Sequence, residues 1–278
     1  MAESLREAFE RTWHAADTLP QPVQAVGLGL AGVEPGTAEA HLVLDLVPQI
    51  LETQRIALET DAYAALLGAH MGKPGVVAIS GTGSIAMGVN AQRQRARAGG
   101  WGWLAGDEGS AFAIGRSGIR AAFNALDGVE PPTLLEEMLP HHLLVPSLYE
   151  VKRLIYAQDF GPRGFASLAP LISEAAQQGD GAALRIIREA GQALANQVSA
   201  VVRRLDFQRA DVAPVGGGFE HIHGLAESFE KAVYALAIPT TVVAPRLAPV
   251  FGAVIMALEQ CQVDLDKVMP VLQSQARI

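Results

Sequence analysis

Apolar positions along the first seventy residues predict helices and strands in alternation. Residues 4–14 repeat apolar side chains every four positions, which indicates one face of an amphipathic helix. The run VQAVGLGLAGV (23–33) is typical of a buried strand that ends in a glycine turn. IALETDAYAALLGAH (56–70) predicts a short strand that becomes a helix at about Asp61. This alternation favours an α/β fold.

A second domain is expected to begin where the pattern is interrupted by Lys73-Pro74-Gly75 and the apolar strand VVAIS follows at once. We therefore predict one domain over residues 1–74 and another over 75–278, with a closing helix that can pack back on the first. The other elements expected in the second domain are a long helix over about 181–205, a strand–turn–helix unit at VAPVGGGFEHI (212–222), a strand at 240–245 and the closing helix from about Val250.

Composition narrows the class of function. The net charge of −8 arises from 29 acidic and 21 basic residues, and the basic cluster Arg93–Arg97 is too short to follow a nucleic-acid backbone. Nucleic acid is therefore not an expected partner. Apolar runs stay shorter than the roughly 18 residues of a spanning helix, and the first residues, MAESLREAFE, are acidic. We expect no membrane partner and a cytoplasmic location.

The stretch VVAISGTGSIAMGVN (76–90) contains a glycine turn that two kinds of site could use. Gly81, Gly83 and Ala86 fit G-x-G-x-x-A, the pattern of a dinucleotide-binding turn, which requires a helix directly afterwards. Here apolar and small residues alternate up to Asn90, which predicts a second strand and a hairpin. Consecutive backbone N–H groups at such a bend can bind phosphate. A tight turn without a ligand is the remaining alternative.

Five segments, in this order, resemble a known family: LETDAYAALLGA, VVAISGTGSIA, GGWGWLAGDEGSA, APVGGGFEHI and RLAPVFGAVIMAL. The chain is similar over about residues 5–258 to the N-acetylglucosamine kinase branch of the sugar kinase, Hsp70 and actin superfamily, often called the BadF/BadG/BcrA/BcrD-type ATPase family. GGWG followed by GDEGS is highly specific, whereas GTGS alone is weak. The resemblance implies a two-domain, ribonuclease H-like (actin-like ATPase) fold in which ATP and sugar meet in the cleft between the domains.

Asp61, in ETDA, matches the family's catalytic aspartate. The resemblance implies that its carboxylate takes the proton of a sugar hydroxyl as the oxygen attacks the γ-phosphate. The alternative is that Asp61 only caps the helix that begins there, because aspartate is favoured at such positions.

The resemblance assigns the glycine turn to phosphate. Thr82 and Ser84 match the second phosphate-binding motif, in which Thr82 faces the phosphates of ATP and Ser84 leans towards the sugar. Gly81 and Gly83 of the same turn are implied, with Thr82, as nucleotide-binding residues. These roles are implied by the family motif.

A second glycine-rich loop matches the family's sugar loop. Gly100, Trp101, Gly102 and Asp107 are implied as substrate-binding residues, with Asp107 binding sugar hydroxyls and the glycines permitting close approach. For Trp101, packing in a core is the alternative. Glu108 is as well explained by a role in holding the loop together, so we leave it outside the predicted site.

Gly216, Gly217 and Gly218 match the family's adenosine motif, where a side chain would obstruct the nucleoside. A glycine turn without a ligand is the alternative here too. His221 and His223 are two residues apart, yet no third ligand is evident, so we predict no metal bound by the protein itself.

The chain departs from the family at its start. Family members begin with a strand, an Asp-Gly-Gly-Gly-Thr turn and a second strand, which grip the β- and γ-phosphates and position Mg²⁺. Here the first residues match the helix after those strands, so we expect the first domain to be N-terminally incomplete and VQAVGLGL to be left with an unpaired neighbour in its sheet. Either the start is misassigned, or the chain binds ligand without transferring phosphate.

The function implied by the resemblance is ATP-dependent phosphorylation of an amino sugar, N-acetylglucosamine to its 6-phosphate in the simplest case, with ATP and Mg²⁺ as cofactors. A homodimer is expected because relatives often dimerise. One alternative is the ATPase activator of 2-hydroxyacyl-CoA dehydratases or benzoyl-CoA reductase, but these proteins bridge an iron–sulfur cluster with cysteines and this chain has only Cys261. Another is a non-catalytic sugar- or nucleotide-binding protein.

Overall fold

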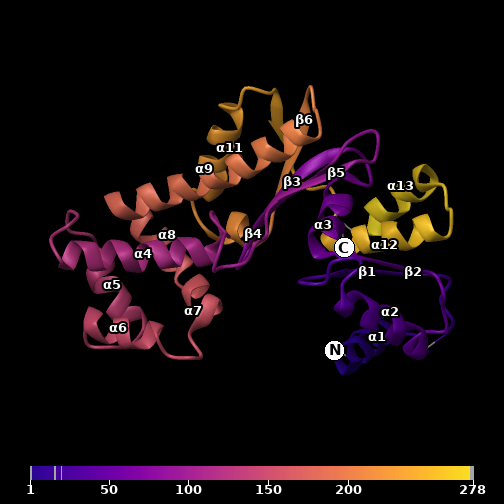
Figure 1. Ribbon diagram of the computed structural model, residues 1–278, viewed down its shortest axis with the longest axis horizontal. Helices are drawn as coiled ribbons and strands as arrows, with labels where there is room; N and C mark the ends of the chain where they lie inside the picture. The colour runs from indigo at the N-terminus through magenta and orange to yellow at the C-terminus, as the bar shows by residue number, and fades with distance from the viewer. Residues whose placement is uncertain (1, 16, 20, 276–278) are drawn as a thin grey trace. The chain divides into compact units, whose positions relative to one another are not determined.

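The computed structural model describes residues 2–15, 17–19 and 21–275 and confirms the predicted α/β class (Figure 1). The described residues form two compact units. One contains those of 1–73 and 245–278, and the other is residues 74–244.

The first unit has a parallel pair of strands, β1 (Val26–Leu30) and β2 (Ile56–Thr60), in which Leu28 is opposite Leu58. Alternate strand residues point to opposite faces of the sheet, so the apolar side chains on each face have to be buried by other elements. Apolar side chains of α1 (Ala2–Ala15) and α2 (Ala38–Ile50) pack on one face. The strands also contact α3 (Asp61–His70) and α12 (Pro249–Gln260), and α13 (Leu265–Gln275) follows α12.

Helices α3 and α12 approach each other closely because α12 has a glycine at the contact. A Cβ atom on Gly252 would overlap the backbone carbonyl of Ala64, so any larger residue would push the two helices apart. The close contact fixes the start of α3, where Asp61 lies, on the body of the unit.

The second unit is built on a five-stranded mixed sheet in the order β5-β4-β3-β6-β7. The strands are β3 (Gly75–Ser80), β4 (Ser84–Val89), β5 (Arg95–Gly99), β6 (Ala210–Val215) and β7 (Thr240–Val242). The predicted hairpin is confirmed, because β3 and β4 are antiparallel with Ser80 opposite Ser84. A strand, and no helix, therefore follows Gly83, so the dinucleotide-turn alternative is wrong.

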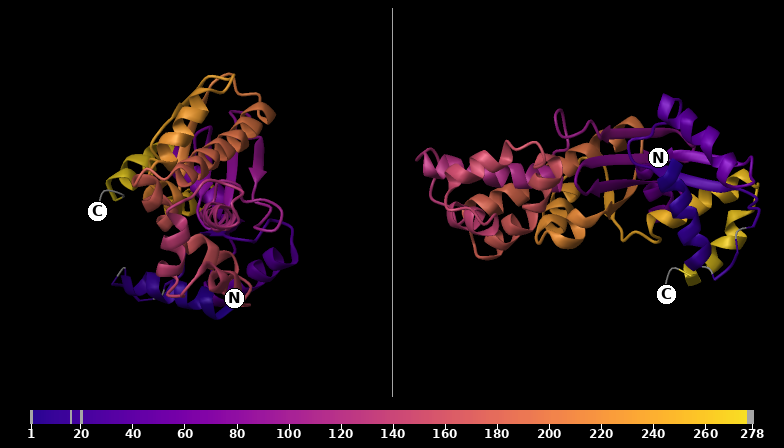
Figure 2. Two further views of the ribbon diagram at one scale, coloured as in Figure 1. Left: turned by 90° about the vertical axis from the view of Figure 1, so that its left-hand side faces the viewer. Right: turned by 90° about the horizontal axis from the view of Figure 1, so that it is seen from below.

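Helices surround this sheet. The long helix α9 (Gly181–Arg204) packs along β3, β4 and β5. Figures 1 and 2 show the helices between β5 and α9 gathered as one group at an end of the unit. They are α4 (Ala111–Leu126), α5 (Leu135–His142), α6 (Leu148–Ile155), α7 (Gly161–Ser167) and α8 (Ala169–Gln177). Two further helices, α10 (Gly217–His221) and α11 (Leu225–Tyr234), connect β6 to β7.

The topology brings two predicted motifs to one edge of the sheet. Strands β3 and β6 are parallel neighbours, with Ile79 opposite Val215. Their carboxyl ends therefore lie side by side, so the turn after β3 (81–83) and the turn after β6 (216–218) share an edge. In α/β sheets, ligands commonly bind outside the carboxyl ends of the strands.

None of the helices within the described ranges is long and apolar enough to cross a membrane.

Candidate active site

The turn between β3 and β4 presents free hydrogen-bond donors. The Gly81 N–H donates to the Gly83 carbonyl at 2.9 Å, which closes the bend. The N–H groups of Thr82 and Gly83 donate to no described residue, and Thr82 is exposed. Two adjacent free N–H groups beside a hydroxyl form a concavity suited to an anion such as a phosphate oxygen.

This turn is held by the start of α4. The N–H groups of Ala111 and Phe112 donate to the carbonyls of Gly81 and Thr82, at 2.9 and 3.4 Å. Ser110 caps the helix by accepting a hydrogen bond from the Ala113 N–H at 3.1 Å. The first donors of α4 are thus used internally. Around this turn, the donors without a partner among the described residues are therefore those of Thr82 and Gly83, and not those of the first residues of α4.

Asp107 lies directly against the turn. It is 7% exposed and has a left-handed backbone, with φ of 66°. Its Oδ1 accepts a hydrogen bond from the Ser84 N–H at 3.2 Å, while Oδ2 accepts none from the described residues. A Cβ atom on Gly83 would lie 2.9 Å from Oδ2, so the glycine makes room for the carboxylate. One carboxylate oxygen is left to bind another group.

Ser84, the first residue of β4, is occupied within the protein. It is 3% exposed, and its Oγ donates to the backbone carbonyl of Glu108 at 2.7 Å. Its backbone N–H binds Asp107. These bonds give Ser84 a part in shaping the loop, and its direct contact with a sugar stays a prediction.

All three residues of the 100–102 segment are exposed. The Gly100 N–H donates to the Ser84 carbonyl at 2.9 Å, which joins the segment to β4. Trp101 is 69% exposed, with the Arg97 guanidinium 5.0 Å from its ring centre. Its ring therefore does not fill a core. A Cβ atom on Gly102 would meet nothing within 4 Å. The segment has a free aromatic face and free space for a ligand.

The turn after β6 is more tightly packed. Gly216 has φ of 103°, and a Cβ atom there would lie 2.6 Å from the Ser80 carbonyl oxygen. A Cβ atom on Gly218 would overlap the Ser80 side chain. At Gly217 a Cβ atom would meet, among the described residues, only the side chain of His221, at 3.5 Å. Packing alone explains two of these glycines, and only Gly217 leaves space.

Asp61 begins α3 in the first unit but does not cap it. The cap is Thr60, whose hydroxyl accepts a hydrogen bond from the Tyr63 N–H at 3.2 Å. Asp61 is exposed, and its Oδ1 accepts a bond from the Ala62 N–H at 2.8 Å. The alternative that Asp61 is the helix cap is therefore wrong. Its catalytic role stays a prediction.

Within the part of the chain that the structure describes, no group of three or more His, Cys, Asp or Glu side chains could hold a metal ion. His221 is exposed and lies 3.7 Å from Glu220.

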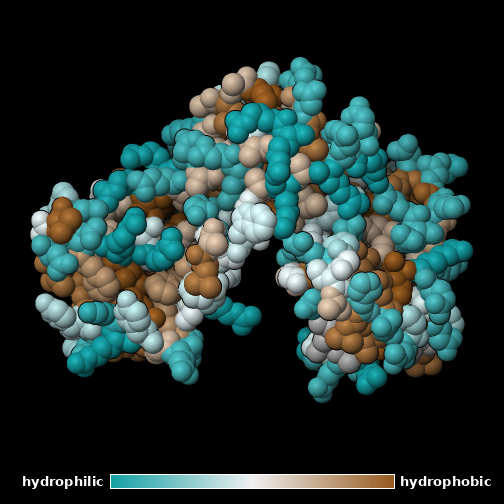
Figure 3. Space-filling model, viewed as in Figure 1, coloured by the Kyte–Doolittle hydropathy of each residue, from teal (hydrophilic) through white to brown (hydrophobic). Residues whose placement is uncertain are grey.

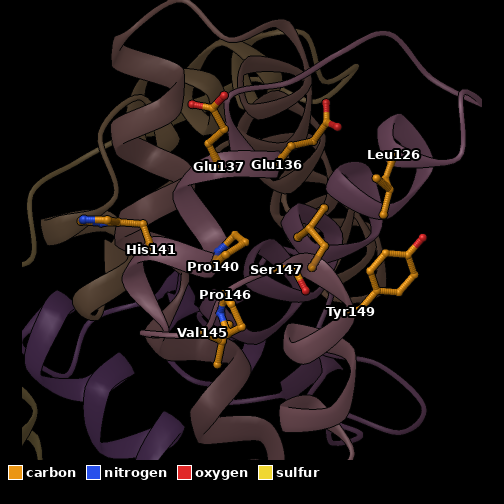
Figure 4. Close-up of a pocket in the computed structure, with 10 residues that line it drawn as sticks. Leu126, Glu136, Glu137, Pro140, His141, Val145, Pro146, Ser147 and Tyr149 are labelled. Atoms are coloured by element: carbon orange, nitrogen blue, oxygen red, sulfur yellow. The ribbon is translucent and has the colours of Figure 1, made fainter.

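A groove of about 490 Å³ lies among α4, α5 and α6, away from the motif residues (Figure 4). Leu126 and Tyr149 stand on one side of it and His141 on the other. Apolar surface is visible on the same helical group in Figure 3. Exposed apolar side chains here include Leu126, Tyr149 and Tyr156. None of the predicted site residues lines the groove.

Gln197 contacts the predicted site residue Ser84 but belongs to none of the predicted motifs. This residue of α9 hydrogen-bonds Ser84 and Glu108, which precede it by 113 and 89 residues. No local motif marks it, and only its place on the sheet-facing side of a long predicted helix could have suggested a contact.

The profile of the BadF/BadG/BcrA/BcrD ATPase family matches residues 1–257. An N-acetylmuramic acid/N-acetylglucosamine kinase of Clostridium acetobutylicum is 32% identical over 239 residues, which are 85% of this chain and 78% of that protein. An N-acetyl-D-glucosamine kinase of Dictyostelium discoideum is 31% identical, over 85% of this chain and 76% of that protein.

A solved structure shares the fold. It is that of a candidate N-acetylglucosamine kinase from Chromobacterium violaceum, with a TM-score of 0.69 and 29% sequence identity. The match covers 88% of this chain and 80% of the other.

Proposed function

The chain belongs to the BadF/BadG/BcrA/BcrD ATPase family, and on that premise we propose that it transfers the γ-phosphoryl group of ATP to an amino sugar. N-acetylglucosamine, converted to its 6-phosphate, is the first substrate to test, because two similar proteins carry it in their names. The enzyme class is a phosphotransferase with an alcohol group as acceptor.

The observation that carries the proposal is the edge of the five-stranded sheet. The N–H groups of Thr82 and Gly83, which donate to no described residue, lie beside the carboxylate of Asp107. Only one oxygen of that carboxylate, Oδ1, accepts a hydrogen bond from the described residues. A kinase needs donors for phosphate oxygens next to an acceptor for sugar hydroxyls. This edge supplies both within a few residues.

The protein's residues would divide the work as follows. Asp107 accepts hydrogen bonds from sugar hydroxyls through Oδ2, and Gly100, Trp101 and Gly102 line the sugar. Asp61 accepts the proton of the attacking hydroxyl, so that the oxygen becomes a better nucleophile as the bond to phosphorus forms. Its exposed carboxylate has an oxygen that the Ala62 N–H does not use.

The nucleotide would be held by the two turns. Gly81, Thr82 and Gly83 bind phosphate oxygens, and the open backbone at Gly217 admits the nucleoside. ATP, when bound, supplies the phosphoryl group. Mg²⁺ would enter as the Mg·ATP complex, held mainly by the phosphates, because the described residues offer no cluster of ligands of their own.

Two further proposals follow from the family. The chain works in the cytoplasm, and it forms a homodimer, for which the exposed apolar side chains of the α4–α6 group are the surface to examine. Sedimentation of the purified chain would test the dimer.

The test is phosphate transfer from Mg·ATP to N-acetylglucosamine, N-acetylmuramic acid, N-acetylmannosamine and glucosamine. We expect turnover of at least one sugar, and we expect Asp61→Asn to lower kcat by about 10²–10⁴-fold because the general base is lost. Sugar and ATP affinity should change little. Asp45→Asn is the matched control, since Asp45 is an exposed carboxylate of α2 in the same unit, and it should keep full activity.

Two outcomes would oppose this function. Sugar binding without turnover would indicate a non-catalytic binding protein. Turnover that survives Asp61→Asn would leave the kinase reaction in place and remove Asp61 from it.

A further inference from the structure

The side chain of Gln197 joins two segments that lie far from it in the sequence. Its Nε2 donates to the Ser84 Oγ and to the Glu108 backbone carbonyl, both at 3.2 Å. The Ser84 Oγ itself donates to the same carbonyl at 2.7 Å. The three groups therefore form a closed triangle of hydrogen bonds between α9, β4 and the loop that carries Asp107.

The chemistry of the partners fixes the direction of the carboxamide. The Glu108 carbonyl can only accept, so the nitrogen of Gln197 has to face it. Oε1 then points the other way. It is the one buried side-chain nitrogen or oxygen in the described residues that has no hydrogen-bond partner. An unpaired buried acceptor costs free energy, and an apolar side chain of similar length would avoid that cost. Only the donor side of Gln197 makes bonds here.

The last residue of strand β5 packs against the carboxamide of Gln197. This residue, Gly99, has φ of 81°, and a Cβ atom there would lie 2.9 Å from both Cδ and Oε1 of Gln197. A residue with a side chain would displace the carboxamide. The glycine thus makes the room that Gln197 occupies, and the group is enclosed between β4, β5 and the loop.

We propose that Gln197 is a positioning residue that sets the Asp107 carboxylate for the sugar, an inference that rests on the proposed kinase function. Asp107 has a left-handed backbone, a conformation that is uncommon for residues other than glycine, and its surroundings have to hold it there. Its Oδ1 is bonded to the Ser84 N–H, and the next residue in the chain is Glu108. Gln197 bonds to both Ser84 and Glu108, and so it reinforces the direct Ser84–Glu108 bond and supports the two residues on which the position of Asp107 depends.

The test compares the wild-type chain with Gln197→Leu and Gln197→Glu. Leucine has a similar size and no donor, and glutamate keeps the shape of glutamine but presents a carboxylate to the Glu108 carbonyl. We expect each variant to raise the KM for the sugar by about tenfold, the loss of roughly two hydrogen bonds. The KM for ATP and Tm should change little, because the bonds that hold the Gly81–Gly83 bend and the start of α4 remain.

Gln192→Leu is the matched control. Gln192 is on the same helix, is exposed, and donates to Asn196 of its own helix. It should leave both KM values unchanged. A selective rise in the sugar KM for both Gln197 variants supports positioning. No change in either KM, or an equal rise in both together with a fall in Tm, would overturn it.

Failure of the kinase function is a separate result. If the wild-type chain phosphorylates none of the sugars, the proposed function fails, and the link made by Gln197 is tested by amide hydrogen exchange over residues 100–110. Faster exchange in Gln197→Leu than in Gln192→Leu supports the fixed loop. Equal exchange in the two variants overturns it.

Discussion

The turns after β3 and after β6 look alike in sequence, yet glycine is needed in them for different reasons. Both lie at the carboxyl edge of one sheet, on neighbouring parallel strands. In the first turn, only Gly83 is packed, against the Asp107 carboxylate. A Cβ atom on Gly81 would meet no described residue within 4 Å, and the N–H groups of Thr82 and Gly83 have no partner among the described residues. In the second, Gly216 and Gly218 are pressed against Ser80, and only Gly217 has space.

A glycine motif can therefore combine two requirements. Some glycines bring one strand end close to another, and others keep a surface open for a ligand. Ser80 connects the two turns, because Gly216 and Gly218 pack against it and its Oγ donates to the Gly109 carbonyl, in the loop that carries Asp107, at 2.9 Å. Substitutions in the second turn should therefore separate packing from binding.

The largest effect is expected from Gly218→Ala. The added methyl group overlaps the Ser80 side chain and lies 2.9 Å from its carbonyl oxygen, so the end of β3 has to shift. Overpacking of this kind costs about 1–3 kcal/mol. Chemical denaturation should show the loss, with activity falling as well. An unchanged free energy of unfolding would mean that Gly218 is not a packing residue.

A smaller and different effect is expected from Gly217→Ala. Its methyl group meets only the end of the His221 side chain, at 3.5 Å, so Tm should not fall. If the open side of this turn receives the nucleoside, ATP affinity should weaken by about tenfold, equivalent to about 1.4 kcal/mol. Calorimetric titration with ATP measures it. Unchanged affinity would show that the turn has only a structural role.

The smallest effect is expected from a substitution of Glu130, which belongs to neither turn and serves as a control for the two glycine variants. Hydrogen bonds from Asn124 and then Arg185 lower the pKa of Glu130. A lowered folded-state pKa adds stability above the unfolded value, near 4.5, and this stability is lost as pH falls through the folded pKa.

Glu130→Gln should therefore lower Tm slightly at pH 7, and the difference from wild type should vanish in acid. Thermal unfolding over a pH series from 7 down through the acid range in which Glu130 becomes protonated measures it. A difference that persists in acid would show that the Glu130 charge does not contribute. Gly217→Ala should show no such pH-dependent difference from wild type.

Much of the fold follows from local patterns. The apolar run before Gly81 and the alternation after it were enough to predict the β3–β4 hairpin, because strand residues repeat with a period of two. The long amphipathic stretch near 181–205 was enough for α9, which spans Gly181–Arg204. The site residues came from motifs, and their roles stay predictions that the experiments above test.

The order of elements, the hairpin bend and the family can be predicted from the sequence, since each depends on residues near one another in the chain. Tertiary structure alone decided that Thr60 and not Asp61 caps α3, that Trp101 is exposed, and which glycines are packed. It also brought Gln197 to Ser84 across 113 residues. Side-chain contacts between distant segments depend on how elements pack, and no local period or motif carries that information.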